Sequence, residues 1–273
     1  NSPAVPLERI PYLDSTPTHS YMKFLYKYSQ SAFPYERLVE ENRRRGSWDY
    51  EFELVDTGAF DANRYFDIVI EYAKASEEDL CARVTAWNRG PAPATLHLLP
   101  QLVYRNTWSW GPRPCRSPRI ELGCSEADPH QPALLADDAE LPPLKELAAP
   151  YHLGRRWFYF PRHGEPLFTE NETNHDVAGA RGGWSNSPYV KDAFHRYVVG
   201  GEPCVNPARQ GSKAAVRYRL QGIEPGGSVT LEFRLTPRGD LLDPLADVAS
   251  IIEQRRNEAD EFHASLQPPR ASD

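Results

Sequence analysis

The 273-residue sequence has only four cysteines and one methionine. Cys81, Cys115, Cys124 and Cys204 show no CxxC spacing, so there is no pattern for a structural zinc site or a redox pair. So few cysteines in a chain of this length are typical of reduced thiols in a cytosolic protein. We therefore expect a cytoplasmic location, no metal and no cofactor.

The sequence also lacks long hydrophobic runs and an excess of basic residues. No apolar run approaches the ~20 residues of a membrane helix, and the first ten residues show neither the basic start nor the apolar stretch of a secretory signal. The formal net charge of −7 argues against nucleic acid, whose phosphates require a basic surface. The basic run Arg43–Arg45 follows Glu40 and Glu41 and is predicted to be a solvated helix face. Neither a membrane nor a nucleic acid is expected as a partner.

Signatures of common nucleotide-binding and hydrolase sites are missing as well. The sequence contains no GxSxG motif, P-loop or dinucleotide fingerprint. His152 and His163 have no carboxylate or thiol companions at ligand spacing, and His175 with Asp176 alone is too little for a metal site.

Residues 1–48 are predicted to form a helical or irregular arm. Pro34 followed by Tyr35–Arg45, with acidic residues before basic ones, indicates a helix start and a favourable dipole. After Trp48 the hydrophobic period changes to two. Residues 65–74 place Asp67 and Glu71 on one face of a half-buried strand. The apolar face of that strand contains Phe66, Ile68, Ile70 and Tyr72.

Turn-rich segments join several further predicted strands. Residues 80–87 and 95–104 flank such a segment and predict an antiparallel hairpin. Residues 214–220 and 229–235 alternate around the turn Glu224–Gly227 and form the clearest predicted hairpin. Short strands are expected at 156–160 and 167–169. Residues 111–155, which are rich in proline and glycine, are expected to form a long loop.

A C-terminal helix follows Asp243 and Pro244, which suit a cap and a first-turn position. Its predicted apolar stripe consists of Leu245, Val248, Ile252, Ala259, Phe262 and Leu266. Strands with short turns and no βα alternation predict a mainly β fold, an antiparallel β-sandwich with peripheral helices. The expected division is an arm at 1–48, a β-sandwich domain at 49–240 and a linker-like helix at 241–273.

Six motifs occur in an order typical of one family. They are residues 13–45, 54–76, 105–111 (RNTWSWG), 167–174 (LFTENETN), 187–192 (SPYVKD) and 205–220. Together they resemble the amino-terminal region of bacterial glucosidase-like proteins of glycoside hydrolase family 63, which includes the mannosyl-oligosaccharide glucosidases. The resemblance spans roughly Tyr12–Leu266.

This resemblance implies a β-supersandwich that precedes a catalytic (α/α)6 barrel. The family's general acid and general base lie in that barrel, so no catalytic residue can be carried over to the 273 positions of this chain. The expected function is a non-catalytic domain of an α-glucosidase acting on glucosyl oligosaccharides. Its expected partner is the barrel, in the same longer chain or in a separate polypeptide, and the isolated chain is expected to be inactive. Without the barrel, an exposed apolar surface should remain.

The motif LFTENETN raises a catalytic alternative. If the strand continues, Glu170 and Glu172 project from one face about 6–7 Å apart, within reach of the roughly 6.5–9.5 Å between the carboxyl groups of inverting glycosidases. Any E-x-E on a strand has this spacing, and catalysis also requires an apolar wall that raises one pKa. The alternatives are a solvated polar loop and a rim facing a sugar or the barrel. Asn171 and Asn174 would serve such a rim because amides both donate and accept hydrogen bonds.

The motif RNTWSWG places Trp108 and Trp110 two residues apart, so both can lie on one face of an extended segment. This is typical either of core packing or of a surface that contacts a sugar or another domain. Arg105 and Asn106 beside the pair favour the surface. SPYVKD and residues 206–211 (NPARQG) are turn-like and predicted to be structural.

Two other functions fit the same residues. A stand-alone carbohydrate-binding module would use Trp108, Trp110 and Glu170–Asn174. A mutarotase-like sugar epimerase would need a His and a Glu that converge on an anomeric oxygen, for which His97 and Glu170 are candidates.

Overall fold

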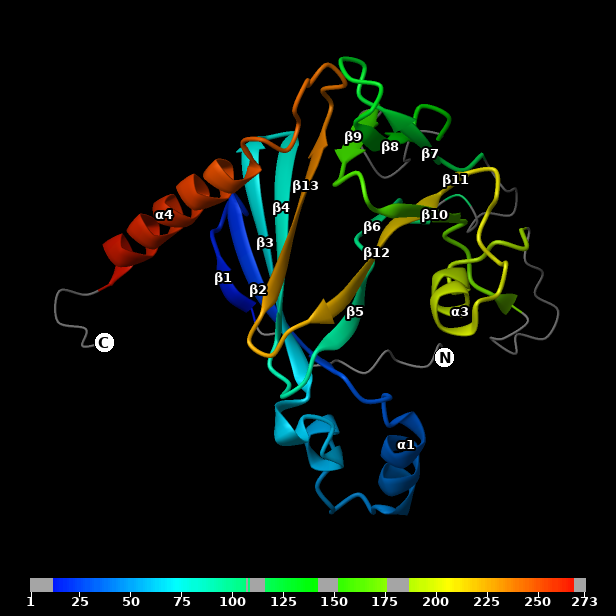
Figure 1. The fold of residues 1–273 in the computed structure, drawn as a ribbon, viewed down its shortest axis with the longest axis vertical. Helices are drawn as coiled ribbons and strands as arrows, with labels where there is room; N and C mark the ends of the chain where they lie inside the picture. The colour runs from blue at the N-terminus through cyan, green and yellow to red at the C-terminus, as the bar shows by residue number, and fades with distance from the viewer. Residues whose placement is uncertain (1–11, 107, 109–115, 142–151, 176–186, 268–273) are drawn as a thin grey trace.

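The computed structural model describes residues 12–106, 108, 116–141, 152–175 and 187–267. These residues form two β-sheets that converge at one end of the molecule and diverge towards the other (Figure 1). Within each sheet, every described strand pairing is antiparallel. The predicted class, a mainly β antiparallel sandwich with a C-terminal helix, is confirmed.

The larger sheet has nine strands. In spatial order they are β1 (Tyr12–Ser15), β2 (Tyr21–Ser29), β3 (Tyr65–Ser76), β4 (Asp79–Asn88), β13 (Ser228–Thr236), β9 (Arg156–Tyr159), β8 (Pro132–Asp137), β7 (Arg119–Cys124) and β11 (Gln210–Gly211). The smaller sheet consists of β10 (Glu165–Thr169), β12 (Lys213–Ile223), β5 (Ala94–Leu98) and β6 (Gln101–Val103). The helices are α1 (Tyr35–Arg44), α3 (Ala193–Gly200) and α4 (Val248–Leu266), with 3-10 turns η1 (Leu54–Thr57) and η2 (Asp61–Asn63).

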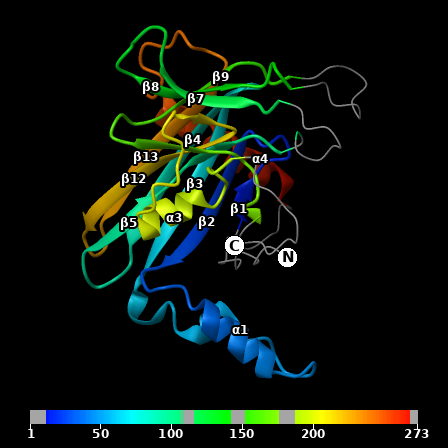
Figure 2. The same ribbon diagram turned by 90° about the vertical axis from the view of Figure 1, so that its right-hand side faces the viewer.

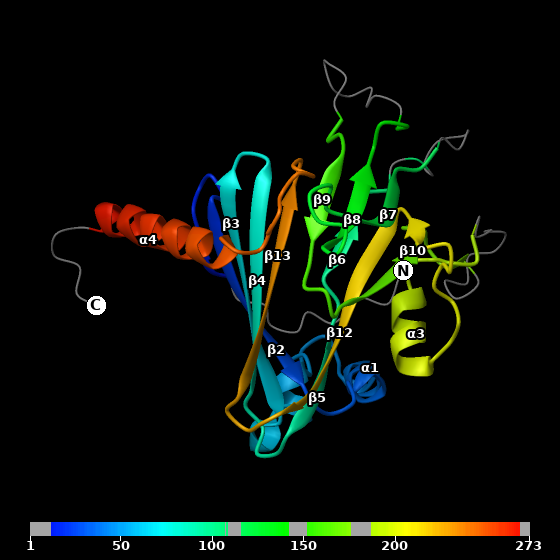
Figure 3. The same cartoon turned by 45° about the horizontal axis from the view of Figure 1, so that its top comes forward.

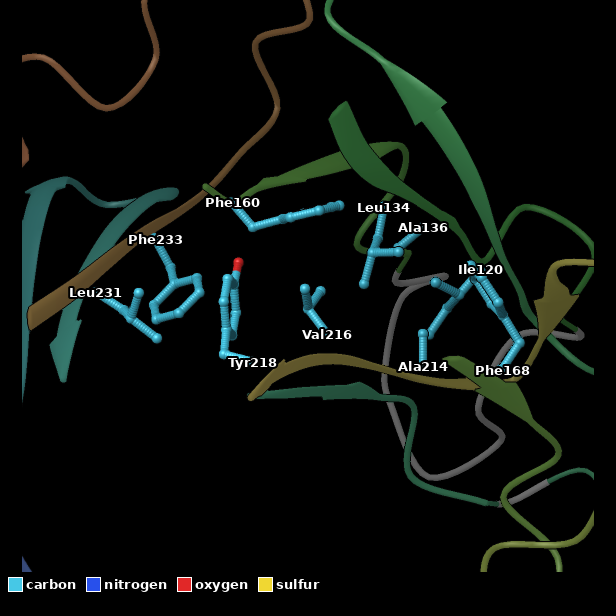
Figure 4. Packing of buried hydrophobic residues seen from close by; sticks show 10 residues of the cluster. All are labelled: Ile120, Leu134, Ala136, Phe160, Phe168, Ala214, Val216, Tyr218, Leu231 and Phe233. Carbon is cyan, nitrogen blue, oxygen red and sulfur yellow. The ribbon is translucent and has the colours of Figure 1, made fainter. Parts of the chain in front are cut away.

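The main core lies between β12 of the smaller sheet and β13, β8 and β7 of the larger one (Figure 4). Period-two alternation places Val216 and Tyr218 of β12 on this inner face. The Tyr218 hydroxyl donates to the carbonyl of Pro161 at 3.1 Å, so the buried phenol keeps a hydrogen bond. Its ring meets Phe233 of β13 edge-on, with ring centroids 5.9 Å apart.

The two predicted hairpins are wrong in their pairing. Strands occur in all four predicted segments, although residues 95–104 contain two strands, β5 and β6, in place of one. In the described sheets, β12 lies between β10 and β5, whereas β13 lies between β4 and β9. The connection at 224–227 therefore joins the two sheets, as does the connection from β4 to β5. Alternation shows which face of a strand is apolar, but it does not show which strand lies alongside.

Asn88 holds the point where the sheets converge. It is fully buried, and its amide donates to the carbonyls of Ala92 at 2.8 Å and Ile223 at 2.7 Å. Its side-chain oxygen accepts from Gln30 and from the backbone N–H of Gly90. A completely paired polar side chain of this kind stabilises the junction, because an unpaired amide would be costly at a buried position.

Two regions predicted without strands contain them. Strands β1 and β2 lie within residues 12–29, so the helical or irregular interpretation is wrong there; it is correct for residues 30–48, which contain α1. Within 111–155, described strands β7 and β8 replace the expected loop. Pro118 precedes β7 and Pro132 begins β8, positions where a missing N–H costs no ladder hydrogen bond. The division into domains at 48 and 240 remains a prediction.

The polar face of the strand predicted to be half-buried is itself covered. Asp67 is 9% exposed and Glu71 5% exposed. Helix α4 packs on β2, β3, β4 and β13 on the side away from the smaller sheet (Figure 3). Val248, Ile252 and Ala259 of the predicted stripe are fully buried, whereas Phe262 and Leu266 are 37% and 66% exposed. The stripe is thus confirmed for the first part of the helix.

The connection between β2 and β3 forms a projecting arm, residues 30–64, which contains α1, η1 and η2. The arm extends from the end where the two sheets converge (Figures 1 and 2). Arg43 and Arg44, predicted to lie on a solvated helix face, are exposed.

Candidate functional site

The structure brings two predicted motifs together at one corner of the sandwich. Asn171 of LFTENETN donates from its side-chain amide to the carbonyl of Tyr104 at 2.8 Å. Asn106 of RNTWSWG donates in return to the carbonyl of Asn171 at 2.9 Å. Residues far apart in the sequence are therefore adjacent here, as a shared functional rim would require.

Glu170 is tied to the backbone at the same corner. Strand β10 ends at Thr169, and the Glu170 carboxylate accepts from the hydroxyl of Ser212 at 2.5 Å and from its N–H at 3.1 Å. The Ser212 hydroxyl oxygen also accepts from the N–H of Asn171 at 2.9 Å. This carboxylate therefore has a structural partner, which weakens the catalytic reading of Glu170 with Glu172.

The SPYVKD motif pairs with LFTENETN through its backbone. The N–H of Glu170 donates to Tyr189 at 2.7 Å, and the N–H of Lys191 donates to Glu172 at 3.0 Å. The Asn174 amide donates to a carboxylate oxygen of Asp192 at 3.0 Å. These bonds support the structural role predicted for residues 187–192.

Gly211 permits the close approach of chains that builds this corner. A side-chain carbon at this position would lie 2.3 Å from the carbonyl oxygen of Thr169, closer than any side chain tolerates. Asn206 donates from its backbone to Phe168 at 2.8 Å and from its side chain to Gln210 at 2.7 Å. The NPARQG motif is therefore structural, as predicted.

The tryptophan pair is only partly described. Trp108 is 3% exposed, which favours core packing over a flat sugar-binding surface. Trp110 lies outside the described residues. Arg105 is exposed beside this corner. Whether Arg105, Asn106, Glu170, Asn171, Glu172 and Asn174 face a sugar or a barrel stays a prediction.

An open polar groove of about 520 Å³ lies on the outer face of β7, β8 and β11. Six of its lining residues are Arg119, Glu121, Asp137, Arg155, Glu170 and Asn206. Four carboxylates and two arginines line the groove, so its lining is net acidic; one ion pair lies within it, between Arg119 and Glu121 at 2.6 Å. Such a mixture of hydrogen-bond donors and acceptors is suited to the hydroxyl groups of a sugar.

Most residues of this groove were not predicted as site residues, because residues 111–155 were expected to form a loop and not strands. The signal was nevertheless present in residues 119–122, where Arg119 and Glu121 alternate with Ile120 and Leu122. Ile120 is fully buried in the core, so the two charged residues must point to the opposite, outer face.

A second cavity, the apolar cleft, has a volume of about 400 Å³ and lies between the two sheets. Its lining includes Tyr26, Tyr28, Ile70, Tyr72, Leu98 and Leu102. Tyr28 is 43% exposed, so part of this apolar surface is open to solvent. An exposed apolar surface is what the resemblance predicts for a domain that contacts a barrel.

The structure contradicts the proposed epimerase pair. His97 lies opposite Arg219 in the pairing of β5 with β12, whereas Glu170 is bonded to Ser212, just before β12 begins. Seven residues of extended chain separate Ser212 from Arg219, or about 23 Å. One sugar ring cannot bridge this separation, so a mutarotase-like role for these two residues is wrong. Burial, together with the nearby Arg217 and Arg219, lowers the pKa of His97.

In the part of the chain that the structure describes, no three His, Cys, Asp or Glu side chains gather as they would around a metal ion. Cys81, Cys124 and Cys204 are free thiols, and burial raises the pKa of Cys81 to about 12. Among the described helices, none is both long and apolar enough to span a membrane.

Comparisons with known proteins provide one clear relative. No family model matches the chain. An uncharacterized protein of Saccharomyces cerevisiae, YMR196W, is 34% identical to this chain over an alignment of 303 residues. The alignment covers 96% of this chain and 26% of the yeast protein. The chain therefore spans about a quarter of the length of the curated relative it matches.

A solved structure from Escherichia coli K12, named as a putative aldose 1-epimerase, covers 82% of this chain and 67% of its own. Its TM-score is 0.26 and its sequence identity 11%, so the match carries no argument about fold or function. These comparisons give no support to the resemblance to glycoside hydrolase family 63.

Proposed function

We propose that this chain is a non-catalytic β-sandwich domain of a longer glycoside hydrolase similar to family 63. In this proposal it supports a catalytic (α/α)6 barrel that acts on glucosyl oligosaccharides. The observation that carries the proposal is the corner where the two motifs meet. Its acidic and amide groups bond to Ser212 and to the backbone carbonyls of neighbouring segments, as expected of a scaffold.

The length of the yeast relative supports the same proposal. A sequence 34% identical to this one makes up 26% of a longer polypeptide, and such a polypeptide has room for a separate catalytic domain. The apolar cleft adds a second argument, because a partly exposed apolar surface on a stable domain commonly contacts another domain.

The decisive experiment measures hydrolysis of p-nitrophenyl α-glucoside by the 273-residue chain and by the full polypeptide of its gene. We expect turnover only from the full polypeptide. Glu170→Gln in the full polypeptide should lower stability through the lost Ser212 contacts and leave the pH profile of turnover unchanged. Turnover by the 273-residue chain that is abolished by Glu170→Gln would overturn the proposal, because the catalytic acid would then lie in this domain.

The polar groove favours a second candidate, a carbohydrate-binding module. Isothermal titration with gluco-oligosaccharides separates the two functions, since only a binding module gives saturable heat. If heat is observed, Arg155→Ala in the groove should remove it. Arg238→Ala is the matched control because Arg238 is an exposed arginine paired with Asp240 and does not line the groove.

A further inference from the structure

The projecting arm leaves most of its large apolar side chains exposed to solvent. None of the ten residues of α1 is buried. Trp48 is 98% exposed and Tyr50 is 93% exposed. Three further apolar side chains of the arm are about half exposed: Tyr35, Val39 and Val55. Aromatic side chains are enriched at protein interfaces relative to the rest of the surface, so two of them exposed in one loop make that loop a candidate contact site.

Specific hydrogen bonds hold the loop that carries these aromatics. The Asn42 side chain accepts from the N–H of Phe52 at 2.8 Å and donates to its carbonyl at 2.9 Å. Phe52 is 8% exposed, with the guanidinium groups of Arg37 and Arg45 over its ring at 5.3 and 5.1 Å from the centroid. Phe52 therefore packs against the arm, whereas Trp48 and Tyr50 point away from it.

Further bonds order the turn itself. The carboxylate of Asp49 accepts from the N–H of Gly46 at 2.7 Å, and Arg45 donates to the carbonyl of Tyr50. A loop ordered in advance loses less conformational entropy when it binds, so more of its contact energy appears as affinity. Tryptophan and tyrosine are also the residues that most often dominate binding energy at interfaces.

We propose that the arm is a docking element, in which Trp48 and Tyr50 insert into the remainder of the longer polypeptide. This inference rests on the proposed function in one respect, namely that the chain is one domain of a longer protein. The partner surface would hold an apolar pocket bordered by carboxylates. Arg43 and Arg44, both exposed, end α1 close to Trp48 in the sequence and would face those carboxylates. Arg44 would do so by exchanging Glu41, with which it forms an exposed pair at 3.3 Å.

The size of the exposed surface favours a tethered partner over a second copy of the chain. Two aromatic side chains bury roughly 150–250 Å² each, less than the ~800 Å² per partner of a stable free-standing interface. A partner in the same polypeptide is held at a high effective concentration and needs less contact area. The length of the yeast relative shows that such additional chain accompanies a similar sequence.

Hydrogen exchange of residues 46–52 tests this assignment. In the full polypeptide of the gene, these amides should exchange about tenfold more slowly than in the 273-residue chain. The double substitution Trp48→Ala with Tyr50→Ala should return exchange to the rate of the 273-residue chain. Leu242→Ala, which removes a side chain that is 73% exposed and outside the arm, is the matched control and should leave protection unchanged.

Equal exchange rates in the two proteins would overturn the inference. Protection that depends on the concentration of the 273-residue chain would overturn it in favour of a second copy. Protection that appears only on adding gluco-oligosaccharide would overturn it in favour of a sugar. The glycosidase proposal is judged separately from turnover: protection without hydrolysis leaves the docking role intact, and hydrolysis without protection refutes the docking role alone.

Discussion

Helices α4 and α1 are both expected from the sequence, but they differ in what they bury. Val248, Ile252 and Ala259 of α4 are fully buried against the larger sheet. None of the residues of α1 is buried. Sequence patterns thus predict that a helix forms, but they do not show whether the rest of the molecule covers one of its faces. The difference shows which helix contributes a buried face to the stability of the sandwich and which one stays exposed to solvent.

The surface beneath α4 is also rich in paired charges. Arg234 donates to both carboxylate oxygens of Asp79, at 2.8 and 2.7 Å, and to Asp247 at 2.8 Å. Arg83 and the Tyr21 hydroxyl both donate to the carboxylate of Glu71. Burial, together with the hydrogen bond to Glu71, raises the pKa of Tyr21. Buried charges are tolerated here because their hydrogen bonds are largely satisfied.

The largest expected effect comes from Asp79→Ala, which leaves the guanidinium of Arg234 without its bidentate partner. The Arg234 side chain is 8% exposed, so the unfolding free energy should fall by about 3–5 kcal/mol. Urea denaturation measures the change. Asp240→Ala breaks an exposed pair with Arg238 that solvent screens, so it should leave the unfolding free energy almost unchanged. Equal losses of unfolding free energy in the two variants would show that burial beneath α4 does not strengthen the pair of Asp79 with Arg234.

Ile252→Ala should have the next largest effect. This side chain of α4 is fully buried against the larger sheet, and its removal should cost about 2–4 kcal/mol through lost burial and a residual cavity. Leu266→Ala in the same helix removes a side chain that is 66% exposed, and it should change stability by no more than about 0.5 kcal/mol. Thermal or urea unfolding of the two variants compares covered with uncovered positions of one helix.

A smaller effect is expected at Asp67, which points to the same side of β3 as Glu71. Burial acts to raise its pKa, but hydrogen bonds and charge from Lys27 and Arg89 outweigh it and hold the pKa below the usual value. Its contribution is therefore present above the unfolded pKa of about 3.9 and is lost as the pH falls through the folded value. In unfolding measurements from pH 6 to pH 2, Asp67→Asn should flatten the acid decline. An unchanged acid decline of the unfolding free energy would show that Asp67 does not contribute to it.

The smallest effect is expected in the arm. Trp48→Ala and Tyr50→Ala should change the unfolding free energy of the 273-residue chain by less than about 0.5 kcal/mol, because both side chains are almost fully exposed. Phe52→Ala in the same loop should loosen the arm and accelerate proteolysis between residues 46 and 57. Marked destabilisation by Trp48→Ala would mean that the indole packs within the domain.

The sequence predicted individual elements better than their arrangement. Strands β3, β4, β12 and β13 were expected close to where they occur. Asp67 and Glu71 were expected to face solvent, because a single strand pattern does not reveal that a helix or long basic side chains will cover a polar face. Strands β1, β2, β7 and β8 were missed because their polar residues or flanking prolines weakened the alternation.

The candidate site shows the same limit. Both motifs at the corner were identified, but only the structure joined Asn106 to Asn171 and gave Glu170 its partner, Ser212. The same structure separated His97 from Glu170. The outer-face groove also depended on strands that were not expected.

By itself, the sequence determined the β class, the apolar faces of the long strands, the presence of helix α1 and the apolar stripe of α4. These properties follow from side-chain spacing along one segment of chain. Only the tertiary structure decided that β12 and β13 enter different sheets, that α4 is covered and that α1 is not. Those outcomes depend on contacts between segments distant in the sequence, whose free energies no local pattern records.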